Sequence, residues 1–281
     1  MPVKNEQNLT VKDYLVSGEK FTLEYDRSLD LYATKPQPKA ELLHKYYEST
    51  SYISHTDTKK NFIENCYHLV KNYALKKKVH LLTKENNGIG DLLDIGAGTG
   101  DFLVSAKNKG WQVQGVEPNS SARQLALSKG VELSEKLIEV TTEKFDAITL
   151  WHVLEHLPNL EEDINIICSK LKKEGVLVIA VPNHNSYDAK LYKEYWAAYD
   201  VPRHLWHFSK NSISKLFEKE GFEIKKIKPM WFDSFYVSLL SEKYKTGKQN
   251  YLKAFWNGFL SNFKGLFSKE YSSHIYILKR S

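Results

Sequence analysis

Apolar runs alternate with helix-like segments over most of the chain after residue 90. Four helix-like segments end in a charged residue and a glycine, and an apolar run follows at once, at Lys109-Gly110, Lys129-Gly130, Glu174-Gly175 and Glu220-Gly221. Glycine just past a helix end takes the left-handed conformation at little steric cost. The strands predicted in this way cover 91–95, 111–116, 131–133, 145–151, 176–181, 222–227 and 274–278. Strands that alternate with helices indicate parallel βαβ units, so the pattern predicts an α/β fold with a doubly wound sheet.

A helical insertion at about 233–268 interrupts this alternation before the last strand. Within it an aromatic residue recurs every four positions, at Tyr251, Phe255, Phe259, Phe263 and Phe267. This spacing predicts a helix with a broad apolar stripe. Amphipathic helices usually bury such a stripe, so packing in the core or over a cleft is favoured over contact with a membrane.

About 85 residues precede the predicted sheet. The segments 21–25 and 29–34 favour a small hairpin, and apolar spacing predicts a short helix near 42–47 and a longer one after a cap at 56–58. We therefore expect two parts: residues 1–85, a hairpin and helices that cover the cleft, and residues 86–281, the α/β domain with its insertion.

The segment 91–102, DLLDIGAGTGDF, carries the strongest chemical signal. An apolar strand runs into a turn with Gly96, Gly98 and Gly100, and the turn opens a helix. Glycines let the backbone approach a ligand closely, and the first turn of a helix offers free amides. A nicotinamide-binding fingerprint would place its third glycine at position 101, where this chain has Asp101.

Two carboxylates and one further strand accompany this turn. Glu117 ends the next strand, about 20 positions on, where an acid can accept hydrogen bonds from ribose hydroxyls. Asp94 lies inside an apolar strand, where an unpartnered carboxylate is costly, so partners are expected. The strand at 145–151 then leads into the histidine-containing segment His152-Val153-Leu154-Glu155-His156.

With these motifs the chain resembles the class I S-adenosylmethionine-dependent methyltransferases, in particular the bacterial branch related to the ubiquinone-biosynthesis O-methyltransferases. The resemblance covers about 91–209 and implies a Rossmann-like, seven-stranded, mostly parallel sheet with helices on both faces. It implies that S-adenosyl-L-methionine is the cofactor. The cofactor-binding residues that it implies are Asp94, Gly96, Ala97, Gly98, Gly100, Glu117, Pro118, Leu150, Trp151 and Tyr52.

The family usually places an acid after the third strand to meet the adenine amine. The candidates here are Glu132, Glu135, Glu139 and Glu143, and the sequence does not choose among them. Many close relatives also begin with a cysteine-rich zinc knuckle, but residues 11–19 contain no cysteine. We expect no metal there.

Methyl transfer to a hydroxyl or amine needs an aligned nucleophile and a base that removes its proton. His152 and His156 are the catalytic candidates, and His152 is preferred because strand ends border the ligand crevice in such sheets. His156 has the alternative of capping or packing the following helix. The H-x-x-E-H spacing also suits an inverted zinc-peptidase motif, but that motif needs one continuous helix. Related quinone O-methyltransferases resemble this stretch with E-x-x-E-H and a divalent ion; because His152 replaces the first Glu, we expect no metal.

The block 200–209 follows the fifth predicted strand. Its Arg203, His204 and His207 are expected to form a substrate wall. The alternative is that Arg203 pairs with Asp200 and only fastens the loop.

Composition narrows the function classes. The net charge of +6 falls entirely within residues 241–281, which hold eight Lys or Arg against two Glu. Such a tail attracts nucleic acid, anionic lipid or an acidic substrate, although a solvated helix face is the more common outcome. Two cysteines, no apolar run of membrane-spanning length and no secretory leader predict a cytoplasmic protein without a transmembrane segment.

We therefore expect a methyltransferase for a small-molecule or glycan/lipid-precursor acceptor, modified at oxygen, with His152 as base. Peripheral membrane contact is compatible with this expectation, and a nucleic-acid partner is disfavoured. The competing hypotheses are a non-catalytic S-adenosylmethionine-binding regulatory module and an RNA methyltransferase, which only the basic tail suggests.

Overall fold

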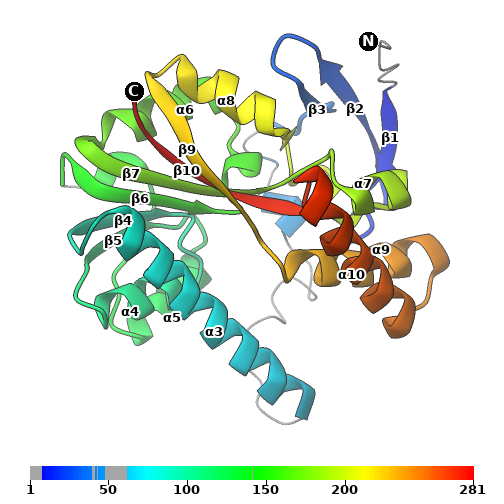
Figure 1. The fold of residues 1–281 in the computed structure, drawn as a ribbon, viewed down its shortest axis with the longest axis horizontal. Helices are drawn as coiled ribbons and strands as arrows, with labels where there is room; N and C mark the ends of the chain where they lie inside the picture. Colours follow the sequence, from blue (N-terminus) through cyan, green and yellow to red (C-terminus); the bar gives the residue numbers. More distant parts are fainter. Residues whose placement is uncertain (1–7, 40–41, 43, 48–61, 141) are drawn as a thin grey trace.

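Two β-sheets organise the chain in the computed structural model, which describes residues 8–39, 42, 44–47, 62–140 and 142–281 (Figure 1). The larger sheet has the order β5-β4-β6-β7-β10-β9, and the smaller one the order β1-β2-β3-β8. The large-sheet strands are β4 (Asp91–Ile95), β5 (Gln112–Val116), β6 (Phe145–Trp151), β7 (Leu171–Pro182), β9 (Phe222–Pro229) and β10 (Ser273–Arg280). The small-sheet strands are β1 (Leu9–Lys12), β2 (Lys20–Asp26), β3 (Leu31–Lys35) and β8 (Trp206–His207).

Helices fill most of the connections. They are α3 (Phe62–Glu85), α4 (Asp101–Lys107), α5 (Ser120–Ser128), α6 (Leu160–Ser169), α7 (Tyr187–Tyr192), α8 (Lys210–Glu218), α9 (Asp233–Thr246) and α10 (Tyr251–Ser268). The short 3-10 helices are η1 (His44–Tyr47), η2 (Leu137–Glu139), η3 (Leu154–His156), η4 (Lys193–Tyr195) and η5 (Ala197–Tyr199).

The α/β class and the mostly parallel sheet are confirmed, but the sheet has six strands in the described chain, not seven. Strands β5, β4, β6 and β7 are parallel, and β10 is antiparallel to both of its neighbours. The segment predicted as a strand at 131–133 forms no ladder, and only an isolated bridge joins Val116 to Ser134. Val131 and Leu133 are nevertheless buried. Their apolar character therefore reflects packing of a short loop rather than strand pairing.

Helices cover both faces of the large sheet because its strands are apolar on both sides. Leu93 and Ile148 point to the face that α6 and α8 cover. Leu92 and Ala147, their chain neighbours, point to the face covered by α3, α4 and α5. This double burial fixes the carboxyl ends of β4, β5 and β6 at one edge, where the candidate site lies.

The smaller sheet joins the N-terminal segment to a distant part of the chain. The predicted hairpin is present as β2 and β3, with Glu24 opposite Ala33. Strand β8, from the block expected to face substrate, pairs with β3 through His207 and Trp206. The N-terminal segment is therefore held to the α/β domain by backbone hydrogen bonds.

The insertion consists of two helices that pack on each other, with Gly247 in the left-handed conformation at the end of α9. Figure 1 shows α9 and α10 together at one side of the molecule, next to α7. The aromatic stripe was expected to be buried, and this expectation is wrong for α10. Most of the stripe faces outward, with exposed fractions of 63% at Phe255 and 76% at Phe267. Among the described helices, none is both long and apolar enough to cross a bilayer.

Candidate active site

The glycine turn after β4 adopts the conformation that its sequence requires. Gly96, Gly98 and Gly100 have φ angles of +69°, +53° and +76°. A Cβ on Gly96 would lie 2.3 Å from a methyl group of Val153, so this glycine is needed for packing. A Cβ on Gly98 would meet nothing within 4 Å. The turn is therefore tight on its protein side and open where a ligand would approach.

Glu117, which follows β5, is fastened to this turn. One carboxylate oxygen accepts a hydrogen bond from the Gly98 amide at 2.9 Å, and the other accepts one from the Asn119 amide at 2.9 Å. The side chain is half-buried, and the neighbouring Pro118 is exposed. Two of the predicted cofactor elements, the turn and the acid, are thus adjacent in space. Ala97, between Gly96 and Gly98 in the turn, donates its amide hydrogen to the Val116 carbonyl.

Asp94 is 3% exposed and accepts a 2.5 Å hydrogen bond from the Thr149 hydroxyl on β6. Burial raises its pKa to about 7, although Thr149 and the charge of Lys78 oppose the rise. The predicted need for partners is met on one oxygen. A carboxyl group with this pKa is poised to ionise when a cationic group binds beside it.

Lys78, on α3, was missed by the sequence analysis. Its Nζ lies 4.2 Å from the centre of the Trp151 ring, and burial lowers its pKa against the pull of Asp94 and Asp233. Trp151 ends β6, is half-buried, and has an indole N–H without a hydrogen-bond partner among the described residues. The preceding Leu150 is fully buried in the core. Lys78 follows two other lysines, so its local sequence resembles a solvated helix face.

His152 follows Trp151 with φ +59°, a conformation that is costly for a residue with a Cβ. Its Nδ1 lies 3.2 Å from Glu155 and its Nε2 lies 3.0 Å from Asp233, the first residue of α9. Burial would lower its pKa, but the Asp233 and Glu155 carboxylates raise it to about 10. In this arrangement His152 is a cation without a free lone pair, so the geometry does not support it as a resting base. Asp233 was missed because nothing near it in the sequence marks a site.

His156 and His204 lie against the Glu155 carboxylate. The centres of the two rings are 4.6 Å apart. One potential ligand atom from each of the three residues lies within 4.8 Å of the other two. The Nδ1 of His156 lies 2.9 Å from the Arg203 carbonyl, and the Nδ1 of His204 lies 2.8 Å from the Ala198 carbonyl. Because a carbonyl only accepts, each Nδ1 carries a proton, and in the neutral form of each ring it is Nε2 that keeps the lone pair.

This group has the donor set that a divalent cation requires. Glu155 is fully buried, and its Oε2 has no hydrogen-bond partner in the described structure. Burial and the charge of His204 lower the pKa of His156 to about 4, so His156 is neutral. An orphaned carboxylate oxygen beside two imidazole rings suits metal ligation. The sequence-based expectation of no metal rested on the replacement at His152, and it did not consider His204.

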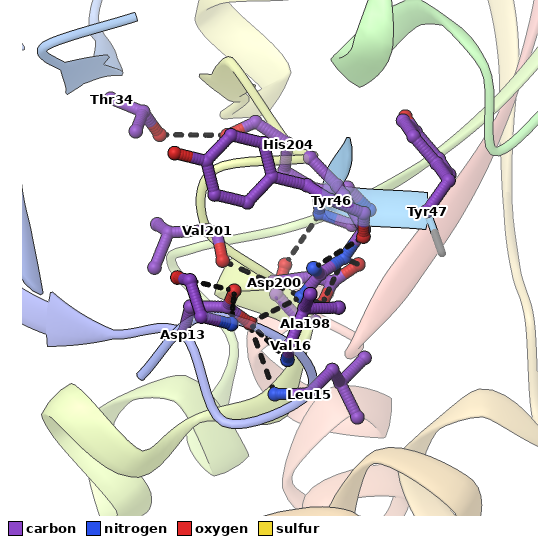
Figure 2. A network of polar contacts seen from close by, with 12 residues as sticks. Asp13, Leu15, Val16, Thr34, Tyr46, Tyr47, Ala198, Asp200, Val201 and His204 are labelled. Carbon is purple, nitrogen blue, oxygen red and sulfur yellow. Dashed lines mark hydrogen bonds and ion pairs between the residues drawn. The ribbon is translucent and has the colours of Figure 1, made fainter. Parts of the chain in front are cut away.

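Arg203 is fully buried and bound to acids from two parts of the chain. Figure 2 shows the polar network to which these acids, Asp13 and Asp200, belong. Its guanidinium lies 3.0 Å from Asp13 and 2.6 Å from Asp200, and it also donates to the Tyr46 carbonyl. These acids raise its pKa further above the ordinary arginine value despite burial. The predicted place on a substrate wall is therefore corrected to the alternative of a loop fastener, because the buried guanidinium is occupied by protein groups.

His207 is also buried in protein contacts and does not form the predicted substrate wall. It is 4% exposed and its Nε2 lies 2.9 Å from the Thr34 hydroxyl of β3. Burial lowers its pKa well below the ordinary value. His207 belongs to the junction between the small sheet and the α/β domain, whereas His204 belongs to the Glu155 group.

Two further predictions concern residues near the cofactor. Tyr52 lies outside the described residues, so its place is not described; Tyr47, which is described, has its hydroxyl 3.0 Å from Nδ1 of His156. Among the adenine candidates, Glu135 pairs with Arg123 at 2.9 Å, and Glu139 accepts the Glu135 amide. Both border a cavity of about 810 Å³ along the outer edge of β5.

A comparison with protein families matches residues 67–227 to a family described as a methyltransferase domain. The human mitochondrial ubiquinone biosynthesis O-methyltransferase is 27% identical over 51% of this chain and 44% of its own length. The Aeromonas salmonicida (strain A449) ubiquinone biosynthesis O-methyltransferase is 32% identical over 34% of this chain and 44% of its own length. The Rickettsia canadensis (strain McKiel) enzyme of that name is 23% identical over 67% of this chain and 87% of its own length. The chain thus spans less than half of the first two relatives.

Solved structures support the same fold. Magnesium protoporphyrin IX methyltransferase from Synechocystis PCC 6803, solved with bound SAH, matches with a TM-score of 0.58 and 15% identity, over 86% of this chain and all of that one. An Archaeoglobus fulgidus SAM dependent methyltransferase matches with a TM-score of 0.51 and 19% identity, over 74% of this chain and 94% of that one. At these identities the likeness concerns the fold.

Proposed function

The chain belongs to the methyltransferase domain family, and from this premise we propose that it transfers a methyl group from S-adenosylmethionine to an oxygen atom of a small-molecule acceptor. Relatives named as ubiquinone O-methyltransferases and a structural neighbour solved with SAH support this assignment. The observation that carries it is the contact between the Glu117 carboxylate and the Gly98 amide, which joins the acid to the glycine turn. A lipid or glycan precursor is the acceptor class that we favour, in a cytoplasmic setting.

The residues around the turn fit this cofactor. The open side of Gly98 gives room for its methionine part, and Glu117 is placed to accept from ribose hydroxyls. Asp94 would meet the cationic amino group, and Lys78 the carboxylate, since each carries the opposite charge. The indole N–H of Trp151, for which the described residues supply no hydrogen-bond partner, offers one more donor. Bound there, the cofactor supplies an electrophilic methyl group on a sulfonium.

The acceptor hydroxyl would meet the group formed by Glu155, His156 and His204. A neutral imidazole with a free Nε2 can take the proton of the hydroxyl as methyl transfer proceeds. Alternatively, these three residues would hold a divalent cation, which lowers the pKa of a bound hydroxyl. In both cases His152 acts as a positioning residue, because its ion pairs tie the end of β6 to Glu155 and to α9.

Calorimetric titration with S-adenosylmethionine tests the first step. We expect binding tighter than millimolar, and a chain that fails to bind at that concentration would overturn the assignment. Transfer from radiolabelled S-adenosylmethionine to phenolic, sugar and polyprenyl-linked hydroxyl acceptors then identifies the acceptor class. Binding without transfer to any acceptor would favour the regulatory-module hypothesis instead.

A further inference from the structure

Helix α10 is amphipathic, but its apolar face points away from the protein, which is the reverse of an ordinary surface helix. The residues that it buries against the protein are all small or polar: Ala254, Asn257, Gly258, Ser261, Asn262 and Gly265. Most of the residues that it exposes are large and apolar: Tyr251, Leu252, Phe255, Trp256, Phe259, Phe263, Leu266 and Phe267. At 3.6 residues per turn the exposed set covers an arc of about 160°.

The inward face is fixed by specific contacts, so the helix has no freedom to turn its aromatic side inward. Ser261 donates to Asp188 at 2.6 Å, and Asn257 donates to the Tyr192 hydroxyl at 2.8 Å. Gly258 allows the backbone of Phe235 to approach, since an added Cβ would lie 2.9 Å from its Cα. Rotating α10 would break these contacts and bury large rings where there is only room for glycine.

The outward rings are arranged along the helix as a continuous surface. Trp256 stacks with Phe259 at 5.7 Å between ring centres, Phe259 with Phe263 at 6.3 Å, and Phe263 meets Phe267 at 5.4 Å. An exposed apolar strip of this length is unusual for a surface that meets only water. It therefore requires an occupant.

Positive charge accompanies this strip. On the helix, Lys253 and Lys264 lie along one edge of the aromatic arc, and Lys243, Lys245 and Lys248 are exposed just before it. Glu242 pairs with Lys253 at 3.2 Å, and Lys264 lies over the Tyr187 ring at 3.8 Å, so the exposed Lys243, Lys245 and Lys248 supply the positive charge that faces solvent beside the strip. The segment 241–281 is the source of the chain's whole net charge of +6.

We propose that the outer face of α10 docks on the surface of an anionic lipid bilayer. A helix with aromatic and leucine side chains on one side and lysines along its edge lies in the headgroup region, with the rings at the acyl boundary. Each lysine near an anionic leaflet adds to the attraction. A second copy of the chain is a poorer occupant, because a two-fold contact would bring the same lysines of both copies together.

The placement of α10 relative to the candidate site is consistent with this role. Helix α9 contributes Asp233 to the His152 ion pair, and α10 packs on α9 through Gly258 and Phe235. A hydrogen bond from Asn262 reaches the Trp231 carbonyl, two residues before α9 begins. Docking therefore brings the residues next to His152 close to a membrane, where an amphipathic acceptor would reside. The docking itself does not depend on the proposed methyl transfer.

Cosedimentation of the full chain with vesicles tests the proposal. We expect binding to vesicles of phosphatidylcholine with phosphatidylglycerol, weak binding to phosphatidylcholine alone, and loss of binding in high salt. The triple substitution Trp256→Ser, Phe259→Ser, Phe263→Ser should lower the affinity at least about tenfold. The matched control Leu125→Ser, Leu127→Ser, Ile138→Ser changes exposed apolar residues elsewhere and should bind like wild type.

A second variant, Lys245→Gln with Lys248→Gln, keeps the rings and should lower affinity for anionic vesicles about tenfold or more. Thermal unfolding and S-adenosylmethionine calorimetry check that each variant is folded. The proposal is overturned if wild type does not bind anionic vesicles, or if the triple variant binds as well as wild type. It is also overturned if wild type is a dimer that the triple substitution converts to a monomer, because a second copy would then occupy the face.

Discussion

Burial shifts the pKa values of individual side chains in the candidate site. Asp94 has a pKa raised to about 7 by burial, and Lys78 has a lowered one. Both lie where opposite charges of an amino-acid-like ligand would compensate them. A zwitterionic ligand would compensate the cost of desolvating both groups, so the site favours such a ligand over a neutral one.

The raised pKa of Asp94 predicts a pH-dependent stability difference. The folded state binds its proton more tightly than the unfolded state, whose pKa is near 3.8, so Asp94 lowers stability as the pH rises from about 4 to about 7. The variant Asp94→Asn keeps an acceptor for Thr149 and removes the titration. Its free energy of unfolding, measured with urea, should rise relative to wild type across this range. A constant difference between the two proteins would contradict the assigned burial effect.

Glu117 is the residue that ties cofactor affinity to the glycine turn. Removing the side chain in Glu117→Ala loses a charged acceptor for the ribose and frees the Gly98 amide, so affinity for S-adenosylmethionine should fall about 10- to 100-fold. Calorimetry measures this, with Glu161→Ala as the matched control because that exposed acid pairs with Lys219 at the surface of α6. Equal affinities for Glu117→Ala and wild type would remove the ribose role.

The group of Glu155, His156 and His204 allows a direct choice between base and metal. If it holds a divalent cation, dialysis against a chelator should reduce turnover, and added Mg²⁺ or Zn²⁺ should restore it. The variant Glu155→Gln should then lose its response to metal, while His207→Gln, a buried histidine outside the group, should keep it. Turnover that chelation leaves unchanged would assign His156 as a metal-independent base.

Among the elements, α10 and α9 show that close packing of a helix can depend on the absence of side chains. Gly258 lies against the Phe235 backbone, and Gly265 lies against the Tyr271 ring. In an isolated helix both glycines would be unfavourable compared with alanine. Here Gly258 lets the two helices approach, and Gly265 makes room for the Tyr271 ring. Helix α9, on which α10 packs, carries the Asp233 that lies beside His152.

The substitution Gly258→Ala should therefore destabilise the protein even though alanine is the better helix former. The helix propensity gain is about 1 kcal/mol, whereas overpacking against backbone costs about 1–3 kcal/mol. We expect a net loss of about 1 kcal/mol in urea unfolding. Ser268→Ala, at the exposed end of the same helix, is the control and should change stability by less than about 0.5 kcal/mol. A stabilised Gly258→Ala protein would show that the helices do not approach as closely as described.

At the scale of the whole molecule, Arg203 joins segments that lie far apart in the chain. Asp13 directly follows strand β1 of the N-terminal sheet, and Asp13 and Arg203 are each 1% exposed. The carboxylate of Asp13 also accepts backbone amides from Leu15 and Ser17, so it orders the turn after β1. The pKa of Asp13 is lowered because these amides and Arg203 outweigh its burial.

Removing one partner of this buried pair should cost far more than removing a surface pair. Arg203→Met leaves Asp13 as an uncompensated buried charge, which costs about 3–5 kcal/mol in the free energy of unfolding. Lys219→Met breaks the exposed pair with Glu161 and should cost about 0–1 kcal/mol. Adding Asp13→Asn to Arg203→Met should recover part of the loss. A small effect of Arg203→Met alone would mean that the N-terminal sheet is held by other contacts.

Most of the large sheet could be read from the sequence. The strands at 91–95 and 145–151 were predicted with their bounds, and the hairpin of β2 and β3 was predicted in outline. The glycine turn and the acid after β5 were also identified, because a strand, a tight bend and a helix start are specified by neighbouring residues. Residues 131–133 were misread because buried loop and short strand have the same apolar composition.

The sequence by itself therefore determined the α/β class, the glycine turn and the place of Glu117, since each depends on residues close together in the chain. Only the tertiary structure decided that Arg203 pairs with Asp13, that His204 joins Glu155, and that Asp233 meets His152. It also decided the direction of α10. Helical periodicity reveals that one face is apolar, but which face lies against the protein depends on the small and polar residues that fit its neighbours.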